Sequence, residues 1–415
     1  MVLVGDPATL TELFKKPADE FRWRHRFNWF DVFVGSSSML TNDEPEHKRL
    51  RSAVQVGFSR KRLNRWIPMI VERTDVATER LLADTERDQV VDLEPALRSI
   101  TLEVVLAALF GADFATRATE IGELMQSGHD FVARPTPPHR LPFGLQHRVR
   151  SDRAAIDEII DTEIAKRREH PTGDPFDILE ALVTDGELTD REIRDQVVTL
   201  IGAGFDTTAA ALAWTLWRST LEPDLWNRLG VEADCVLGPI DETSHPLDEH
   251  TLADLELADR VMRETLRLHP PGALTPREAA IDIDIGGYHI PATTMVVWSA
   301  HLAGRDPHTW ADPLRFDPDR FLDPTDQQQA AMRSAWIPFG HGARSCIGFA
   351  LAQMELTLIV ARIAQRLVLV PTTSTVPEPV GVAVNQPDGG VPMQIRGRTT
   401  SREHHVPATC SRRSG

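Results

Sequence analysis

Apolar side chains recur every three or four residues along most of this chain, the spacing that gathers them on one face of an α-helix. The pattern runs through residues 43–57, 60–84, 92–110, 145–170 and 254–268, and turns rich in Pro, Gly and Asp separate these stretches. Strand-like alternation is confined to short pieces. The sequence therefore predicts a mainly α protein with small β-sheets.

The longest helical stretch runs from Leu188 to about Leu221. It begins with a capping-box pattern, in which Thr189 and Glu192 satisfy each other's backbone donors. A helix of this length spans about 50 Å at ~1.5 Å per residue, enough to cross a whole domain. Because residues 197–217 are apolar almost all round, we expect a buried central helix.

Two shorter segments have strand character. Residues 281–299 alternate around a Gly-Gly turn and end in a β-branched run, which predicts a hairpin or small sheet. Residues 391–396 are expected to form a last strand. Since no repeat or linker divides the chain, residues 1–398 are expected to form one domain, and the polar, patternless residues 399–415 a disordered tail.

Charge and composition narrow the possible partners. The formal net charge of −16 argues against binding to nucleic acid or to an anionic membrane over the general surface. No apolar run approaches the ~18 residues of a membrane span, and no signal-peptide pattern is present, so we expect a cytoplasmic protein without an integral membrane anchor. Residues 47–65 are strongly basic, either as a solvated helix face or as a docking surface for an acidic partner.

One cysteine lies in an unusual loop. The three cysteines of the chain are far apart and form no CxxC pair, which argues against a zinc or iron–sulfur site. Cys346, however, is surrounded by Gly340, Gly342 and Gly348, which allow a tight loop, and an apolar helix follows directly. The start of a helix favours a thiolate. Taken alone, Cys346 has two interpretations, a buried structural cysteine or a thiolate ligand.

The segment Phe339–Gly348 resembles the FxxGxRxCxG signature of the cytochrome P450 family at every defined position. The resemblance implies the cytochrome P450 fold, with haem b between the long central helix and the loop and helix that carry the cysteine. It also implies that Cys346 is the axial ligand of the iron, that Phe339 packs near its sulfur, and that Arg344 faces a haem propionate. A thiolate ligand favours cleavage of the O–O bond.

A second motif, Ala203–Thr208 (AGFDTT), lies within the long helix. Its acid and hydroxyl groups need polar partners in an apolar helix, and a Thr hydroxyl can open the helix locally by bonding the preceding turn. The stretch is similar to the (A/G)Gx(D/E)T(T/S) motif of the family. This similarity implies that Thr207 stabilises the activated oxygen and that Asp206 supports proton delivery.

Further residues match the family in order along the chain. By resemblance, Glu264 and Arg267 of an ExxR motif, with Arg320 of an FxPxRF segment, form a triad that serves folding and haem insertion. His47 and Arg51, within EHKRLR, and Arg277, after Pro-Pro, match cations that bind the haem propionates in the family. The alternative for each of these three is an ordinary surface cation.

The resemblance implies a monooxygenase that inserts one atom of O₂ into an apolar small molecule such as a lipid, steroid or terpene. Because the chain lacks a glycine fingerprint for a flavin or nicotinamide, electrons are expected from a ferredoxin-type donor with its reductase, docked on residues 47–65. The alternatives are a peroxide-driven or isomerising haem-thiolate enzyme and a non-catalytic haem protein. Residues 2–7 are similar to the family's second strand and the helix that follows it. We therefore expect the family's first strand and helix to be missing, which predicts an uncovered sheet edge.

Overall fold

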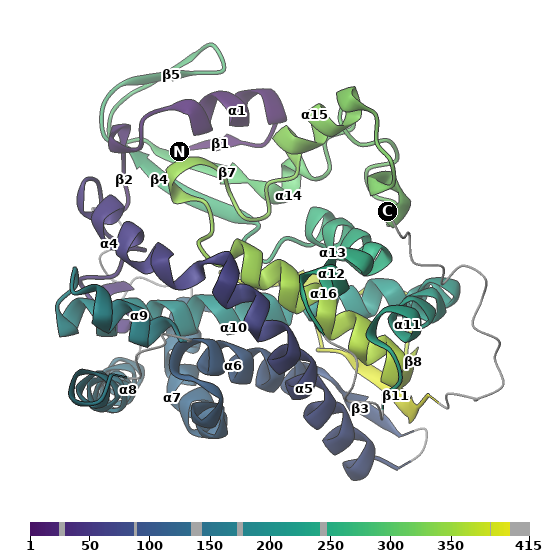
Figure 1. The fold of residues 1–415 in the computed structure, drawn as a ribbon. Coiled ribbons are helices and arrows are strands. Elements are labelled where there is room, and N and C mark those ends of the chain that lie inside the picture. The colour runs from purple at the N-terminus through teal and green to yellow at the C-terminus, as the bar shows by residue number, and fades with distance from the viewer. Residues whose placement is uncertain are drawn as a thin grey trace.

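The computed structural model describes residues 1–24, 30–86, 89–133, 143–171, 177–240, 247–381 and 383–398, and helices dominate it (Figure 1). The helices are α1 (Pro7–Lys15), α3 (Asp31–Val34), α4 (Glu46–Gln55), α5 (Arg60–Asp84), α6 (Glu94–Phe110), α7 (Ala118–Ala133), α8 (Phe143–Glu169), α9 (Ile178–Asp185), α10 (Asp190–Leu221), α11 (Pro223–Leu237), α12 (Glu249–Asp254), α13 (Glu256–Leu268), α14 (Ala300–Ala303), α15 (Asp326–Ala335) and α16 (Phe349–Arg366). The mainly helical fold predicted from the sequence is confirmed, whereas the expected tail at 399–415 lies outside the described residues.

The strands are short and lie in four small sheets. They are β1 (Val2–Val4), β2 (Phe21–Arg22), β3 (Val90–Asp92), β4 (Leu274–Ala279), β5 (Ile283–Ile285), β6 (Tyr288–Ile290), β7 (Met295–Ser299), β8 (Leu367–Pro371), β9 (Pro379–Val380), β10 (Gln386–Pro387) and β11 (Pro392–Gly397). The largest sheet has the order β1-β7-β4-β2, with β1 at one edge and parallel to β7. The Gly-Gly turn joins β5 and β6 into the expected hairpin, but β7 pairs with β1 and β4 instead.

Helix α10 runs through the middle of the molecule and packs against α6, α13 and α16 (Figure 1). It begins at the predicted capping box of Thr189 and Glu192, with both reciprocal hydrogen bonds formed. The expectation that no apolar run approaches the length of a membrane span was wrong, because α10 is the one described helix long and apolar enough to cross a membrane. However, 72% of its most apolar window is buried within the protein. Its apolar character therefore reflects a place in the core.

A buried ion cluster links α13 to the segment that leads to the cysteine loop. The Arg267 guanidinium donates two hydrogen bonds to Glu264, at 2.7 and 2.8 Å, and both side chains are fully buried. Arg320 Nε donates to Glu264 Oε1 at 3.0 Å. Arg267 also donates to the carbonyl oxygens of Gly304 and Pro313, at 2.6 and 2.7 Å, so that one carboxylate and two guanidiniums hold residues 304–320 against α13.

Neutralising the carboxylate of this cluster should destabilise the fold strongly. Glu264→Gln leaves two guanidiniums buried without their anion, a change that typically costs about 3–5 kcal/mol. Asp259→Asn is the control, because it removes the exposed Arg263–Asp259 pair (2.7 Å) of the same helix and should cost less than about 0.5 kcal/mol. Urea unfolding followed by circular dichroism measures both, and equal losses would contradict the assignment.

Candidate active site

The loop before α16 holds Cys346 at its tip. Gly340 and Gly342 adopt φ angles of 68° and 72°, in the left-handed region that favours glycine. The loop closes where the Cys346 N–H donates to the Phe339 carbonyl oxygen at 2.8 Å. The Phe339 ring packs edge-on against Phe349, with the ring centroids 4.7 Å apart. These contacts fix the backbone on both sides of the thiol.

Cys346 is exposed, although many protein atoms surround its thiol. Desolvation raises its pKa, while a hydrogen bond from the Gly348 backbone and the charge of Arg51 lower it. A thiol in such a place becomes a stable thiolate when a further positive charge binds it, as a metal ion does. The iron of a porphyrin takes a single ligand of this kind from the protein, and the thiol of Cys346 suits that role.

The structure brings the four predicted propionate residues together around this loop. His47 on α4 is buried, and its Nδ1 lies 2.6 Å from Glu44 Oε1. Its pKa is lowered by desolvation and by the charge of Arg344. Desolvation also lowers the pKa of Arg51, which the charge of Cys346 partly offsets. The interpretation of these residues as ordinary surface cations does not fit such burial.

Arg277 and Arg344 are the cations that most need an anion. Desolvation lowers the pKa of Arg277 to about 10, and the charge of Arg344 adds to this effect. Desolvation likewise lowers the pKa of Arg344 to about 10, although Glu44 and Asp43 oppose it. The Nε atoms of both arginines are buried without a hydrogen-bond partner in the described part of the chain. Such donors fit the two carboxylates of a haem.

Helix α10 exposes one short stretch within its buried length. Ala203 is exposed, and Gly202, Gly204, Asp206 and Thr207 are half-buried. The Thr207 hydroxyl donates to the Ala203 carbonyl oxygen at 2.7 Å, the bond expected to loosen a helix locally. The carboxylate of Asp206 points elsewhere and forms an ion pair with Arg98 of α6.

The Arg98–Asp206 ion pair joins α10 to a pocket at the surface. Arg98 Nη1 lies 2.7 Å from Asp206 Oδ1, and its guanidinium lies over the Phe205 ring at 5.3 Å. Desolvation raises the pKa of Asp206, against the charges of Arg98 and His129. Arg98 and Phe205 also line a pocket of about 550 Å³, whose wall includes Glu94. No sequence pattern indicated this partner of Asp206, because Arg98 is more than 100 positions away in the chain and belongs to no motif.

A second residue that the motifs did not identify is Glu355 on α16. It is almost fully buried and hydrogen-bonds to Thr208, the residue after Thr207. Desolvation raises its pKa to about 8. In the sequence, Glu355 stands out only as a charged residue on the apolar face of an amphipathic helix. That pattern does not reveal that its partner is Thr208.

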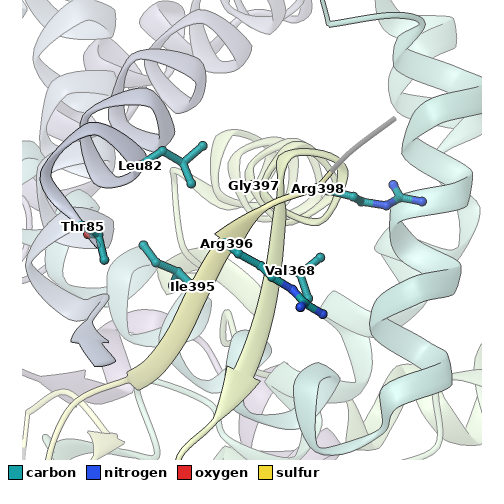
Figure 2. Close-up of a pocket in the computed structure, with 7 residues that line it drawn as sticks. All are labelled: Leu82, Thr85, Val368, Ile395, Arg396, Gly397 and Arg398. Atoms are coloured by element: carbon teal, nitrogen blue, oxygen red, sulfur yellow. The ribbon is translucent and has the colours of Figure 1, made fainter. Parts of the chain in front are cut away.

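A separate pocket of about 570 Å³ lies far from this site (Figure 2). Its lining comes from the end of α5 and from β8 and β11, and consists of Leu82, Thr85, Val368, Ile395, Arg396, Gly397 and Arg398. Cys346 precedes the N-terminus of α16, whereas strand β8 follows its C-terminus. The 18 residues of α16, at ~1.5 Å each, separate the thiol from β8 by about 27 Å. This pocket is therefore not part of the thiol site.

Comparison with known proteins identifies the family. The sequence model of the cytochrome P450 family matches residues 1–391. The chain belongs to the cytochrome P450 family. A putative cytochrome P450 139 of Mycobacterium bovis is 31% identical over 361 residues, which cover 85% of this chain and 82% of the relative. The family of the chain makes it a P450 monooxygenase, and P450 proteins bind haem.

Other relatives have names that state an activity. A pentalenene oxygenase of Streptomyces avermitilis is 29% identical, over 89% of this chain and 81% of its own. A cyclooctat-9-en-7-ol 5-monooxygenase of Streptomyces melanosporofaciens is 31% identical, over 82% and 74%. The solved structure of a retinoic acid-bound cyanobacterial CYP120A1 superposes with a TM-score of 0.83 at 22% identity and covers 95% of this chain and 89% of that one. The P450 fold predicted from the sequence is thus confirmed.

The buried acid of α16 predicts how stability depends on pH. Glu355 keeps its proton in the folded chain up to about pH 8, whereas the ordinary pKa of a glutamic acid is 4.5. Its contribution to stability is therefore present below about pH 4.5 and is lost as the pH rises to about 8, by at most ~1.4 kcal/mol per pH unit. Glu355→Gln should remove this loss in urea unfolding between pH 5 and 8. Glu79→Gln, which changes an exposed acid of α5, is the control and should lose stability with rising pH as the wild type does. The same dependence of stability on pH in wild type, Glu355→Gln and Glu79→Gln would contradict the raised pKa of Glu355.

Proposed function

We propose that this P450 uses haem b to insert one atom of O₂ into an apolar small organic substrate, with electrons from a separate ferredoxin and its reductase. The observation that carries the proposal is the accessible Thr207–Asp206 pair on α10, a helix that packs directly against the helix after Cys346. A haem protein that only carries or senses a ligand has no need of an acid and a hydroxyl at this place. We further propose a cytoplasmic location, supported by the burial of α10.

The residues around the thiol would hold the cofactor from two sides. Cys346 would bind the iron, with Phe339 and Gly348 shaping the loop around its sulfur. The propionates would be bound by four clustered side chains with nitrogen donors, His47, Arg51, Arg277 and Arg344. The Nε atoms of Arg277 and Arg344 have no other hydrogen-bond partner among the described residues. When bound, the haem supplies the activation of O₂.

The side chains of α10 would deliver protons to the oxygen side of the site. Thr207 places its hydroxyl on the accessible stretch of the helix, and Asp206 reaches to Arg98 at the wall of the 550 Å³ pocket. A carboxyl group with a raised pKa between a hydroxyl and a solvent-filled pocket is suited to take up a proton and pass it inward. Arg98 would hold the carboxylate outward between transfers.

The substrate is proposed to be apolar. The accessible stretch of α10 interrupts a helix that is otherwise buried among apolar side chains, so a ligand beside it meets mainly hydrocarbon. Two relatives have names that refer to pentalenene, a hydrocarbon, and to an alkenol, cyclooctat-9-en-7-ol. We propose that residues 110–150, 202–208 and 272–274 line the substrate pocket, and of these, residues 134–142 lie outside the described part of the chain.

The electron donor is proposed to dock on the basic residues of α4 and α5. Lys48, Arg60 and Lys61 are exposed, whereas Arg49 pairs with Glu46 and Glu192. Arg51, which lies one turn after Lys48 on α4, acts electrostatically on Cys346. An acidic ferredoxin attracted to these cations would arrive on the side of the thiol ligand.

Turnover with added redox partners tests the proposed function. The purified holoenzyme with NADPH, ferredoxin and ferredoxin reductase is screened with apolar compounds that displace water from the haem and shift its Soret band. A compound that shifts the band should gain one ¹⁸O atom from ¹⁸O₂. Oxidation that occurs with peroxide but not with NADPH and O₂, or no oxidation of any compound that binds, would contradict the proposal.

Replacing the acid or the hydroxyl of α10 should impair oxygen use in different ways. Asp206→Asn removes a proton donor and should slow NADPH consumption roughly 100-fold, within the range of general acid catalysis. Thr207→Ala should continue to consume NADPH but release mostly hydrogen peroxide. Thr215→Ala is the control, since its hydroxyl donates to the Ala211 carbonyl oxygen at 2.7 Å, the same bond two turns further along α10. Equal product yields from Thr207→Ala and Thr215→Ala would rule out the proposed role.

Reversing the charge of the basic surface should slow reduction. Lys48→Glu, Arg60→Glu or Lys61→Glu is expected to lower the rate of reduction by ferredoxin about tenfold at low salt, and added salt should shrink the difference because it screens exposed charges. The haem spectrum should not change. Arg148→Glu, on α8, is the control. Stopped-flow reduction at wild-type rates would refute this docking site.

A further inference from the structure

Three aromatic rings from the first 23 residues surround the two arginines that face the thiol site. The Arg344 guanidinium lies 3.9 Å from the centre of the Trp23 ring. The Arg277 guanidinium lies 4.7 Å from Phe21, 5.5 Å from Phe14 and 5.7 Å from Trp23. Both cations thus contact the Trp23 ring, and Arg277 lies within a cage of three rings.

The cage has a rigid frame. Phe21 of β2 pairs with Ala279 of β4, two residues after Arg277, so the backbone pairing sets the distance between ring and guanidinium. The backbone N–H of Trp23 donates to Asp43 Oδ1 at 2.6 Å. The guanidinium of Arg344, which lies over the Trp23 ring, is also held by a hydrogen bond, because its Nη2 donates to the Asn42 carbonyl oxygen at 2.6 Å.

The cage holds two cations that repel each other. Among the described residues Arg277 forms no ion pair, and the nearest carboxylate of Arg344, that of Glu44, lies 4.0 Å away. Burial and mutual repulsion lower the pKa of Arg277 to about 10, so both arginines remain charged at neutral pH. Aromatic faces attract a guanidinium but do not neutralise it or accept its in-plane hydrogen bonds. Although Arg344 Nη2 is bound to Asn42, the Nε atoms of both arginines have no hydrogen-bond partner among the described residues and remain available for a ligand with more than one carboxylate.

We propose that Trp23, with Phe14 and Phe21, is a positioning residue for the haem propionates, because its ring contacts the guanidiniums of both Arg344 and Arg277 and holds the two cations beside each other. The inference rests on the proposed binding of haem at Cys346. It assigns to the segment before α3 a part in holding the cofactor, although that segment contains none of the motifs that bind it.

A purely structural role predicts a different behaviour. The same rings belong to or pack against the smaller hydrophobic cluster around the four-stranded sheet, so their loss lowers stability whatever they do for the cofactor. Stability alone cannot separate the two roles. A cofactor whose carboxylates are blocked does separate them, because it keeps the apolar contacts of haem and lacks the charges that the arginines bind.

The test measures the transfer of haem from the ferric holoenzyme to an excess of apomyoglobin. Trp23→Leu should release haem roughly tenfold faster than wild type, and Trp23→Phe, which keeps a ring, within about threefold of it. With the dimethyl ester of haem, the difference between Trp23→Leu and wild type should disappear. Phe114→Leu is the matched control, since Phe114 stacks on Arg117 at 5.4 Å on another part of the chain, and its release rate should not change.

The outcomes distinguish this inference from the proposed function. Failure of the wild-type protein to bind haem would overturn both. Normal binding by wild type with equal release from Trp23→Leu, or faster release of haem and of its ester alike, would overturn the positioning role alone. If Trp23→Leu does not fold, Arg344→Lys replaces it, because lysine keeps the charge and loses the stacked plane. Release from Arg344→Lys that is no faster than from wild type would equally overturn the inference.

Discussion

A buried positive charge is stable only beside a negative one, and around Cys346 the chain has more cationic side chains than carboxylates to pair with them. Arg344 lies within electrostatic reach of Arg51, of Arg277 and of the imidazole of His47, and desolvation lowers the pKa of all four groups. A fold that keeps such a cluster is stabilised by an anion that binds there. The two propionates of a haem would meet this need, and the thiolate of Cys346 would bind its iron.

The remaining structure is arranged to hold this region at fixed distances. The carboxylate of Glu264 gathers Arg267 and Arg320 and thereby fixes the chain that leads to the cysteine loop. On the other side, α10 brings Thr207 close to the site while Asp206 reaches to Arg98. The same helix therefore lies beside the proposed reaction and connects it with a pocket at the surface.

Much of this arrangement follows from the sequence. The capping box of Thr189 and Glu192 and the helical spacing after it predicted α10 correctly. The motif around Cys346 predicted the family, because a glycine-rich loop with one cysteine at a fixed position has few other uses. The ExxR and FxPxRF segments predicted an ion cluster that the structure shows with all three members in contact.

What the sequence did not predict are contacts between residues far apart in the chain that belong to no motif. Arg98, Glu355 and Trp23 each have a partner on another element, and only the packing of the helices or the pairing of strands brings the partners together. Periodicity finds the helix on which such a residue lies but not the side chain it meets. The strand after the Gly-Gly hairpin was likewise placed in the wrong sheet, since alternation gives a strand and not its neighbour.

The claim on which the rest depends is that Cys346 binds the iron of a haem as a thiolate. The CO difference spectrum of the reduced protein tests it most directly, beside that of Cys346→Ala. The account predicts a strongly red-shifted Soret band for the wild type and none for the variant. A band of the kind that histidine ligation gives, or a red-shifted band that survives in Cys346→Ala, would contradict it.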